Sequence, residues 1–579
     1  MQSGQESQTG QEPESTPVPR KVRRAIISLW DKTGAADLAR SLVALGVQII
    51  STGGTARLLS EAGIPVTPMS EITGFPEILG GRVKTLHPRI HGGILARRGN
   101  PSDLAELAAH GIETVDLVAV NLYPFAATIA RPGVSLAEAL ENIDIGGPAM
   151  LRAAAKNFPS VLVLVDPNDY AEVLGYLRAG QAVPLAVRRR LAAKAFAHVS
   201  AYDALIARYL QQDSPAEGAP AGEVPASEAG EGQAPAGRVR AAELPARLCL
   251  DLDKIQDLRY GENPHQIAAW YRPVGQPRMP EAPARLDQLE VLQGKELSYN
   301  NLNDLAATLG LLAEFSRPAA VAVKHATPCG VAEGITPDEP ALPVLRRALE
   351  ADPVSVFGGI VAVNRPVDRA MAEALTSLFL EVVAAPGFTE DALPVLQRKK
   401  NLRVLRMPAD WAARVQSQPP GIEVRAAAGT YLVQTTDAPK PALDGAELLA
   451  RGLWKLVTGP APDAALWEDL VFGWKVVKHV RSNAIVVVRN QVTLGIDGGQ
   501  VNRIDAARHA LQRAGEAARG AVLASDAFFP RGDVVAAAVA AGIRAIIQPG
   551  GSIRDEESIQ GAAAANLTMI FTGRRHFRH

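Results

Sequence analysis

Short apolar runs alternate with longer segments of helical periodicity along the first part of the chain. A short apolar run bounded by turn residues is typical of a buried strand, whereas apolar positions that recur every three or four residues indicate a helix. This alternation predicts a parallel sheet covered by helices on both faces. The predicted strands are 24–29, 47–50, 117–121 and 161–165, and the predicted helices are 34–45, 56–62 and 148–157.

The same alternation returns after residue 300, so an α/β fold is expected in both parts. Residues 484–489 and 491–495 are predicted to pair as strands that turn at Arg489-Asn490. The Ala-rich segment 534–542 is interpreted as a buried helix rather than a membrane span, because no stretch of the chain reaches about 18 uninterrupted apolar residues. The predicted strands here are 319–324, 359–364, 484–489, 491–495, 522–525 and 545–548, with a helix over 504–514.

Two composition breaks suggest the domain organisation. Residues 1–20 are polar and are predicted to form a disordered tail, and residues 211–245 are dominated by Ala, Gly, Pro and Glu. Such segments bury too little apolar surface to offset the entropy of ordering them. The second break predicts a linker between domains at 21–210 and 246–579; a surface loop within one domain is the alternative.

Composition narrows the function classes. Lys+Arg is 60 and Asp+Glu is 61, so the net charge of -1 gives no support to a nucleic-acid binder. Cys249 and Cys329 are the only cysteines, which excludes a disulfide framework and any zinc site that needs three or four thiolates. No apolar signal segment or membrane span is found. A cytoplasmic protein is therefore expected.

Three glycine-rich segments of the first domain carry candidate chemistry. The loop Ser51–Thr55 lies between a predicted strand and a predicted helix, so it either cradles a phosphate or forms a tight turn with nothing bound. The segment Gly80–Gly93 contains cations, a hydroxyl and imidazoles, and its glycines indicate close packing or a ligand; a solvated loop is the alternative. Asp144 lies before a predicted helix on which Arg152 and Lys156 share a face. A carboxylate and a lysine facing one pocket are expected there, or an ordinary exposed helix face.

The second domain contains a histidine beside a lysine. Lys324-His325 follows a predicted strand, and the loop after a parallel strand is where α/β proteins place reactive groups. An imidazole beside an ammonium stays neutral, as a general base requires, although a structural histidine is the alternative. Pro328-Cys329 lacks the partners of a zinc deaminase site. The Phe528-Phe529 pair either contacts a flat ring or fills a core.

These motifs, taken in order, resemble those of the bifunctional purine biosynthesis enzymes, which join IMP cyclohydrolase to AICAR transformylase. The resemblance runs from about residue 22 to the C-terminus and leaves out only the tail and the linker. The matching segments are ISLWDKTG at 27–34, STGGT at 51–55, GGRVKTLHPRIHGG at 80–93, NLYPF at 121–125, ENIDIGGPAMLRAAAKN at 141–157, RYGENPHQ at 259–266, KHATPCG at 324–330, FGGIVAVN at 357–364 and SDAFFP at 525–530.

The resemblance implies a methylglyoxal-synthase-like first domain and a transformylase part of two cytidine-deaminase-like subdomains without zinc. It implies formyl transfer from 10-formyltetrahydrofolate to AICAR, giving FAICAR, and then dehydrative closure of FAICAR to IMP. No metal is required, and a homodimer without nucleic-acid or membrane partners is implied. The alternative is a nucleotide-sensing module that has lost one or both activities.

The resemblance also implies residue roles. Lys156 and Asp144 match the catalytic groups of ring closure, and His325 and Lys324 match those of formyl transfer. The implied nucleotide-binding residues are Lys32, Thr52, Gly53, Gly54, Thr55, Arg82, Lys84, Thr85, Asn121 and Tyr123 in the first domain, and Arg259, Tyr260, His265, Gly358, Glu381, Asn483 and Arg503 in the second. The folate side is implied to be lined by Ile504, Phe528, Asp533, Gly550, Gly551 and Arg575. The chain departs from the family pattern at Trp30, Ala326-Thr327, Arg481 and Arg531-Gly532.

Overall fold

The computed structural model describes residues 21–131, 133–212, 244, 248, 250–274, 284–439 and 444–579. The predicted tail and almost all of the predicted linker lie outside the described residues. The chain divides into two compact units, of which the first contains the described residues up to 212 and the second begins its main part at Leu252. No helix in these described ranges is both long and apolar enough to cross a membrane.

The first unit is built on a parallel five-stranded sheet in the order β3-β2-β1-β4-β5. Ile26 pairs with Ile50 on one side and with Val118 on the other, and all three side chains are buried. Strands covered on both faces read as continuous apolar runs, which explains why they stand out in the sequence. The strands are β1 (Arg24–Ser28), β2 (Gln48–Ser51), β3 (Thr67–Pro68), β4 (Leu117–Val120) and β5 (Leu162–Leu164).

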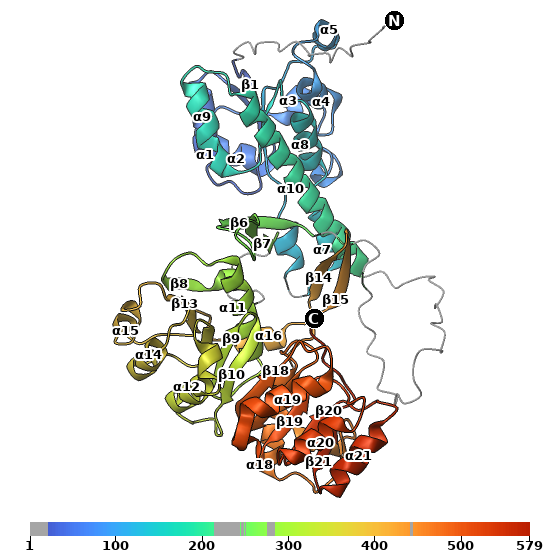
Figure 1. Ribbon diagram of the computed structural model, residues 1–579. Helices are drawn as coiled ribbons and strands as arrows, with labels where there is room; N and C mark the ends of the chain where they lie inside the picture. The colour runs from blue at the N-terminus through green and yellow to red at the C-terminus, as the bar shows by residue number, and fades with distance from the viewer. Residues whose placement is uncertain are drawn as a thin grey trace, which may run out of the picture. The chain divides into compact units, whose positions relative to one another are not determined.

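Helices cover both faces of this sheet, as predicted (Figure 1). On one side α1 contacts α9, and on the other α8 contacts α4 and α10. The start of α2 differs from the prediction by three residues: α2 begins at Gly53, so the glycine pair forms the first helical turn rather than a loop. The helices are α1 (Ala35–Ala44), α2 (Gly53–Glu61), α3 (Met69–Thr73), α4 (Pro88–Leu95), α5 (Pro101–Ala109), α6 (Phe125–Ile129), α7 (Leu136–Glu141), α8 (Gly146–Lys156), α9 (Tyr170–Arg178) and α10 (Leu185–Gln212).

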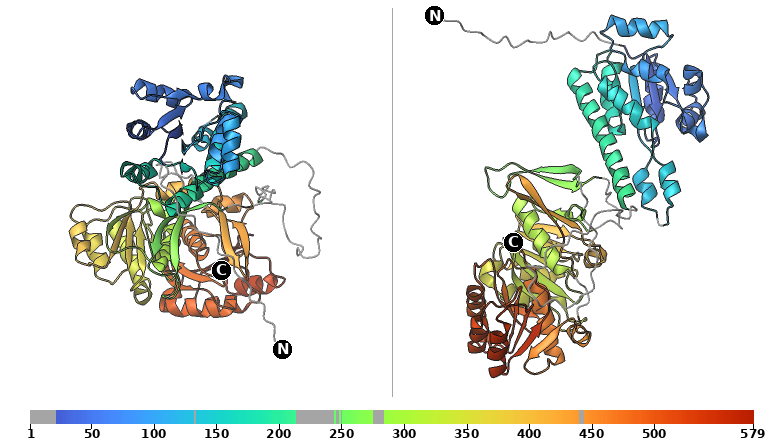
Figure 2. Two further views of the ribbon diagram at one scale, coloured as in Figure 1. Left: turned by 90° about the horizontal axis from the view of Figure 1, so that it is seen from above. Right: turned by 90° about the vertical axis from the view of Figure 1, so that its right-hand side faces the viewer.

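The second unit contains a twelve-stranded sheet in the order β16-β21-β20-β19-β17-β18-β10-β9-β11-β12-β13-β8. Its six-stranded first half and six-stranded second half lie next to each other in both views of Figure 2. The first half consists of β8 (Glu290–Gln293), β9 (Ala319–Lys324), β10 (Thr327–Glu333), β11 (Ile360–Val363), β12 (Val382–Ala385) and β13 (Arg403–Arg406). The second half consists of β16 (Lys455–Thr458), β17 (Ile485–Arg489), β18 (Val492–Asp497), β19 (Val522–Ser525), β20 (Ala545–Gln548) and β21 (Thr568–Phe571).

The two halves have the same connections. Each begins with an edge strand and a long helix, continues with an antiparallel hairpin and a second helix, and ends with three parallel strands joined through helices. β10 and β18 meet antiparallel at Ala332 and Val492, so the halves run in opposite senses from the middle of the sheet. The corresponding helices are α11 (Tyr299–Leu312), α12 (Ala341–Glu350), α14 (Arg369–Thr376) and α15 (Leu393–Gln397) in the first half, and α18 (Ala464–Val477), α19 (Arg503–Ala514), α20 (Asp533–Ala540) and α21 (Asp555–Ala564) in the second.

The sheet of this unit is mixed, and it contains the hairpin predicted to turn at Arg489-Asn490, with the turn one residue later at Asn490-Gln491. β9 and β17 pair antiparallel with both of their neighbours. Apolar runs predict burial, and a run buried on both faces looks alike in either strand direction. Two exposed hairpins, β6 (Leu252–Leu258) with β7 (Ala268–Pro273) and β14 (Ile422–Ala427) with β15 (Thr430–Thr435), stand apart from the sheet. The remaining helices are α13 (Pro353–Val356), α16 (Trp411–Ser417) and α17 (Gly445–Ala450).

Candidate functional site

The start of α2 in the first unit forms a cationic cradle. A Cβ placed on Gly53 would lie 3.9 Å from Lys84 Nζ, and one on Gly54 would lie 3.9 Å from Lys32 Nζ. Two ammonium groups therefore lie over unpaired helix N–H groups, an arrangement that favours an anion. Of the two interpretations of Ser51–Thr55, this geometry favours the phosphate cradle.

The threonines of this loop fix its shape. Thr55 is buried, and its Oγ1 accepts from Leu29 N at 2.9 Å and donates to Leu29 O at 2.8 Å. Thr52 is also buried, with its hydroxyl 3.1 Å from Ser28 Oγ. Both hydroxyls are thus engaged within the protein, and they hold β1 against the start of α2.

A second cluster forms where α8 begins. Asp144 Oδ1 accepts from Gly147 N at 2.9 Å. A Cβ on Gly147 would lie 2.6 Å from Asp144 Oδ2, and a Cβ on Gly146 would lie 2.2 Å from Thr85 Oγ1. Side chains at 146 and 147 would displace these groups, so both glycines are needed for the approach of Asp144 and Thr85.

Asp144 is an unusual carboxylate. Burial raises its pKa, opposed by the Gly147 N–H, the Lys84 ammonium and the Gly146 N–H. Tyr202 of α10 supports it: the hydroxyl accepts from Asp144 N at 2.8 Å and donates to Asn142 O at 3.1 Å. Burial raises the pKa of Tyr202 to about 12, so this hydroxyl remains protonated.

Other predicted residues of the first unit hold neighbouring loops. Asn121 Oδ1 accepts from Trp30 N at 2.6 Å, and its amide donates to Asp31 O at 2.9 Å, so it positions the loop that carries Lys32. Arg82 is exposed and paired with Glu141. Tyr123 is half-buried and contributes to the raised pKa of Tyr202.

The structure does not bring Lys156 beside Asp144. Lys156 is the last residue of α8, about 15 Å along the helix axis from its start. It lines an open groove of 850 Å³ together with Arg152, His91 and Phe196, and Asp144 is not among the lining residues. Arg152 and Lys156 share a face, as predicted. The ammonium that opposes the rise of the Asp144 pKa on burial, however, belongs to Lys84.

In the second unit, Lys324-His325 is placed differently from the prediction. The residues do not follow a parallel strand, since β9 and β10 form an antiparallel hairpin whose turn is His325-Ala326. Lys324 Nζ donates to Phe357 O at 2.8 Å, and the His325 side chain is exposed. The pair therefore points from the edge of the sheet toward solvent, where a substrate can reach it.

Groups from the neighbouring strands surround Lys324. A Cβ on Gly358, whose φ is 76°, would lie 3.9 Å from Lys324 Nζ. The exposed rings of Phe357 and Phe379 lie 5.4 Å apart between centroids. Glu381 directly precedes β12 and pairs with Arg403 at 2.8 Å. This edge thus offers an ammonium, an aromatic pair and a carboxylate to a ligand.

The loop between β6 and β7 lies beside α11, because Asn300 Nδ2 donates to Glu262 O at 3.2 Å. Arg259 and His265 of this loop are exposed, and the Arg259 guanidinium lies 5.6 Å from the ring centroid of Tyr260. An exposed arginine on an aromatic ring keeps donors free for a phosphate.

Asn483 and Arg503 form a cluster with Asp526 in the second half of the sheet. Arg503 donates to Asn483 Oδ1 at 2.6 Å and also to the fully buried Asp526. Asp526 Oδ1 accepts from Ala484 N at 3.1 Å. By strand order this cluster lies three strand spacings from Lys324, roughly 14 Å along the same edge.

The predicted folate residues follow three adjacent parallel strands. Phe528 follows β19, Gly550-Gly551 follows β20 and Arg575 follows β21, so all lie at one carboxyl edge. The Phe pair is divided between its two interpretations, because Phe529 is fully buried in the core while Phe528 is half-buried. Ile504 is half-buried, Asp533 begins α20, and the guanidinium of Arg575 lies 4.7 Å from the Phe577 ring.

Burial raises the pKa of the Cys329 thiol to about 12, and its Sγ lies 3.5 Å from Ala322 O. Among the described residues, no three His, Cys, Asp or Glu side chains are grouped so that they could hold a metal ion.

Sequence reasoning missed several residues of these sites. Tyr202 and Asp304 are separated from their partners by 58 and by 21 or 22 residues. Phe379 lies in the loop before β12 and Arg403 begins β13, whereas Gly358 lies in the loop before β11. No local motif marks such partners, because strand order and helix packing bring them together.

Comparisons with known proteins agree with these motifs. A family model described as "AICARFT/IMPCHase bienzyme" matches residues 154–513. A protein of Anoxybacillus flavithermus, named bifunctional purine biosynthesis protein PurH, is 50% identical over 558 residues, which cover 96% of this chain and 100% of the relative. The chain belongs to the AICARFT/IMPCHase bienzyme family.

A second relative and a second family model support this membership. A Chloroflexus aurantiacus protein with the same name is 53% identical over 571 residues, covering 96% of this chain and 99% of the relative. A model described as "MGS-like domain" matches residues 34–149, which confirms the predicted class of the first domain. The likeness of the second unit to cytidine deaminases stays a prediction. A solved structure titled "Crystal structure of ForH" is 44% identical over 33% of this chain and 97% of that chain, with a TM-score of 0.30.

Proposed function

We propose that this protein catalyses the last two steps of IMP synthesis: formyl transfer to AICAR, giving FAICAR, and closure of FAICAR to IMP with loss of water. The observation that carries the proposal is the full-length identity to bifunctional purine biosynthesis proteins. The geometry adds an exposed imidazole beside an ammonium in one unit, and in the other a cationic cradle with a half-buried carboxylate, Asp144, whose pKa burial raises and the Lys84 ammonium lowers.

In formyl transfer, the 5-amino nitrogen of AICAR attacks the formyl carbon of 10-formyltetrahydrofolate. The amine is a weak nucleophile, so His325 accepts its proton as the new C–N bond forms. The bond from the formyl carbon to N10 of the folate breaks, and N10 takes up a proton. Lys324 stabilises the oxyanion formed on the carbonyl oxygen. Phe528 and Arg575, at the carboxyl edge of β19 and β21, are proposed to contact the folate.

In ring closure, the carboxamide nitrogen of FAICAR attacks its own formamide carbon and water leaves. The reacting groups belong to one molecule, so positioning supplies much of the rate. Asp144 orients the amide, Lys84 stabilises the developing charge, and Lys32 with the start of α2 holds the phosphate. Lys156 stays a predicted catalytic residue, to be compared with Lys84 by single alanine variants.

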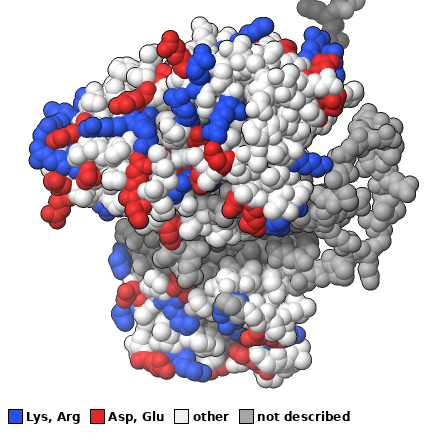
Figure 3. Space-filling model, turned by 90° about the horizontal axis from the view of Figure 1, so that it is seen from below, with Lys and Arg blue, Asp and Glu red and all other residues white. Residues whose placement is uncertain are grey.

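We also propose that the protein is a cytoplasmic homodimer. The β14–β15 hairpin exposes Tyr431 and Leu432, whose exposed fractions are 70% and 62%, and a lone two-stranded hairpin is marginal in water. A second copy covering this hairpin would make it part of a dimer interface. On the face drawn in Figure 3 the charges of both signs are interspersed, so no single-sign surface there favours nucleic acid. Light scattering after gel filtration measures the mass, and a monomer would contradict the dimer.

The function is tested by incubating the protein with AICAR and 10-formyltetrahydrofolate and measuring IMP. Accumulation of FAICAR alone would mean that ring closure is absent. Binding of AICAR without either product would favour a nucleotide-sensing module instead. Supplying FAICAR directly separates the two activities.

A further inference from the structure

The turn that carries His325 has an unfavourable backbone. The φ angles of His325 and Ala326 are both 55°, in the left-handed region. Two-residue hairpin turns of this kind favour Asn and Gly, and other L-residues adopt the conformation only at a cost in free energy. The surrounding structure must therefore hold the turn in place.

Asp304 of α11 supplies that support. Its Oδ2 accepts from His325 N at 3.1 Å, and its Oδ1 accepts from Ala326 N at 2.7 Å. One carboxylate thus binds both N–H groups of the turn. Burial raises the pKa of Asp304, and the two backbone hydrogen bonds oppose that rise.

The other half of the sheet contains the same arrangement. Asn490 and Gln491 form the turn between β17 and β18, with φ angles of 54° and 51°. Asp469 accepts from Asn490 N at 3.0 Å and from Gln491 N at 2.8 Å. Asp304 and Asp469 are each the sixth residue of the long helix before the hairpin.

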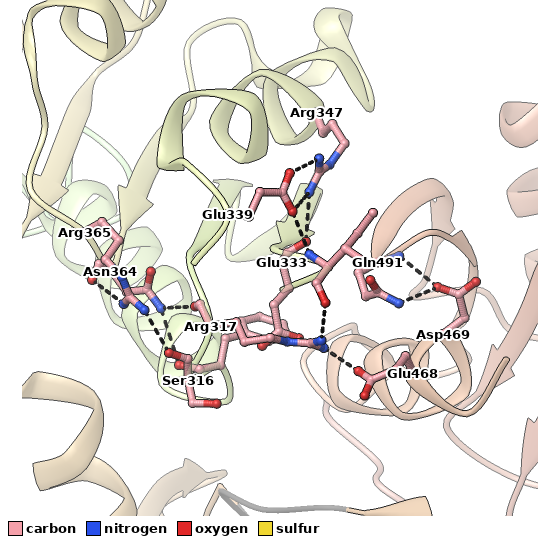
Figure 4. A network of polar contacts seen from close by, with 12 residues as sticks. Ser316, Arg317, Glu333, Glu339, Arg347, Asn364, Arg365, Glu468, Asp469 and Gln491 are labelled. Atoms are coloured by element: carbon pink, nitrogen blue, oxygen red, sulfur yellow. Dashed lines mark hydrogen bonds and ion pairs between the residues drawn. The ribbon is translucent and has the colours of Figure 1, made fainter. Parts of the chain in front are cut away.

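Figure 4 shows the surroundings of this second turn, where Gln491 and Arg317 are engaged by carboxylates. Lys324 corresponds in the hairpin to Arg489, and His325 to Asn490. The clamp by an aspartate is therefore a feature of the fold, and only the first half combines it with an exposed imidazole.

We propose that Asp304 is a positioning residue for formyl transfer, which fixes the His325-Ala326 turn so that the imidazole and the Lys324 ammonium face the substrate together. This inference rests on the proposed transformylase activity. Asparagine at 304 has a single acceptor oxygen and no charge, so it cannot bind both N–H groups as the carboxylate does.

The test compares Asp304→Asn with the matched control Asp469→Asn in the full chain. We expect Asp304→Asn to lower kcat for formyl transfer by about 10- to 100-fold with little change in KM for AICAR, because small misplacement of a reacting group is costly. Asp469→Asn is expected to keep kcat within about twofold, although thermal unfolding shifts downward in both variants. Closure of supplied FAICAR should be unchanged in both.

A rescue variant separates positioning from general damage. Adding Ala326→Gly to Asp304→Asn should recover part of kcat, because glycine adopts the left-handed conformation freely. An unchanged kcat in Asp304→Asn, or equal losses in both aspartate variants, would overturn the inference. Absence of transfer by the unaltered protein would instead overturn the proposed function.

Discussion

The two halves of the twelve-stranded sheet share their connections and differ in what they present at the hairpin turn. In the first half the turn carries Lys324 and His325, and the imidazole is exposed. In the second half the corresponding residue, Asn490, is also exposed but carries an amide, and the buried Gln491 side chain donates to Asp469 at 3.3 Å. The same backbone arrangement therefore supports an imidazole in one half and an amide in the other.

The surroundings of the two turns differ in the same way. Beside the second turn, Arg317 pairs with Glu333 and Glu468, and Arg347 donates to Glu333 O (Figure 4). Beside the first turn, Lys324 Nζ has a carbonyl partner in Phe357 and faces Gly358. Ion pairs neutralise the charges beside the second turn, whereas the Lys324 ammonium beside the first turn stays near solvent. The two halves thus share their backbone geometry, and their side chains determine which half carries reactive groups.

The largest expected difference concerns the turn residues themselves. His325→Ala removes the proposed base, and we expect formyl transfer to fall by roughly 10²- to 10⁴-fold. Asn490→Ala at the corresponding position should leave transfer unchanged, and both variants should close supplied FAICAR at the normal rate. Equal losses in the two variants, or a loss of ring closure, would break the comparison.

A second difference concerns the residue that follows the first parallel strand of each half. Asp526 is fully buried and paired with Arg503, so Asp526→Ala leaves a buried cation and should cost about 3–5 kcal/mol of unfolding free energy. Asn364 is neutral, accepting from Ala319 N at 2.7 Å, and Asn364→Ala should cost about 1–3 kcal/mol. Urea denaturation measures both values, and the reverse order would contradict this account.

The pH dependence should be alike in the two halves. Burial raises the pKa of both Asp304 and Asp469 above the ordinary 3.8. Such a group contributes stability that is fully present below pH 3.8 and is lost as the pH rises through the folded pKa. Each single Asn variant should therefore show a shallower fall of unfolding free energy above about pH 4. A slope that changes in only one variant would show that the clamps are not equivalent.

The smallest difference is conformational. Ala326→Gly should stabilise the protein by a few tenths of a kcal/mol up to about 1 kcal/mol, because it relieves a left-handed alanine. Gln491→Gly gains the same relief but loses a side-chain hydrogen bond to Asp469, so it should be neutral or destabilising. Paired thermal melts measure the difference, and a more stable Gln491→Gly variant would be the contrary result.

The sequence by itself determined many of the buried strands and helices and the chemistry-bearing motifs. Apolar runs predicted the strands β1, β9 and β19, because a buried strand is set by residues that are neighbours in the chain. The Lys324-His325 pair and the Ser51–Thr55 loop were identified in the same local way. Turn position was predicted to within one residue between β17 and β18.

Only the tertiary structure decided the strand directions, the hairpin that holds His325 and the partners of the reactive groups. The ammonium that opposes the rise of the Asp144 pKa on burial belongs to Lys84, which lies 60 positions away in the chain. Asp304 clamps a turn more than 20 positions later. Such pairs depend on how helices pack against strands, and local periodicity carries no information about contacts between distant segments.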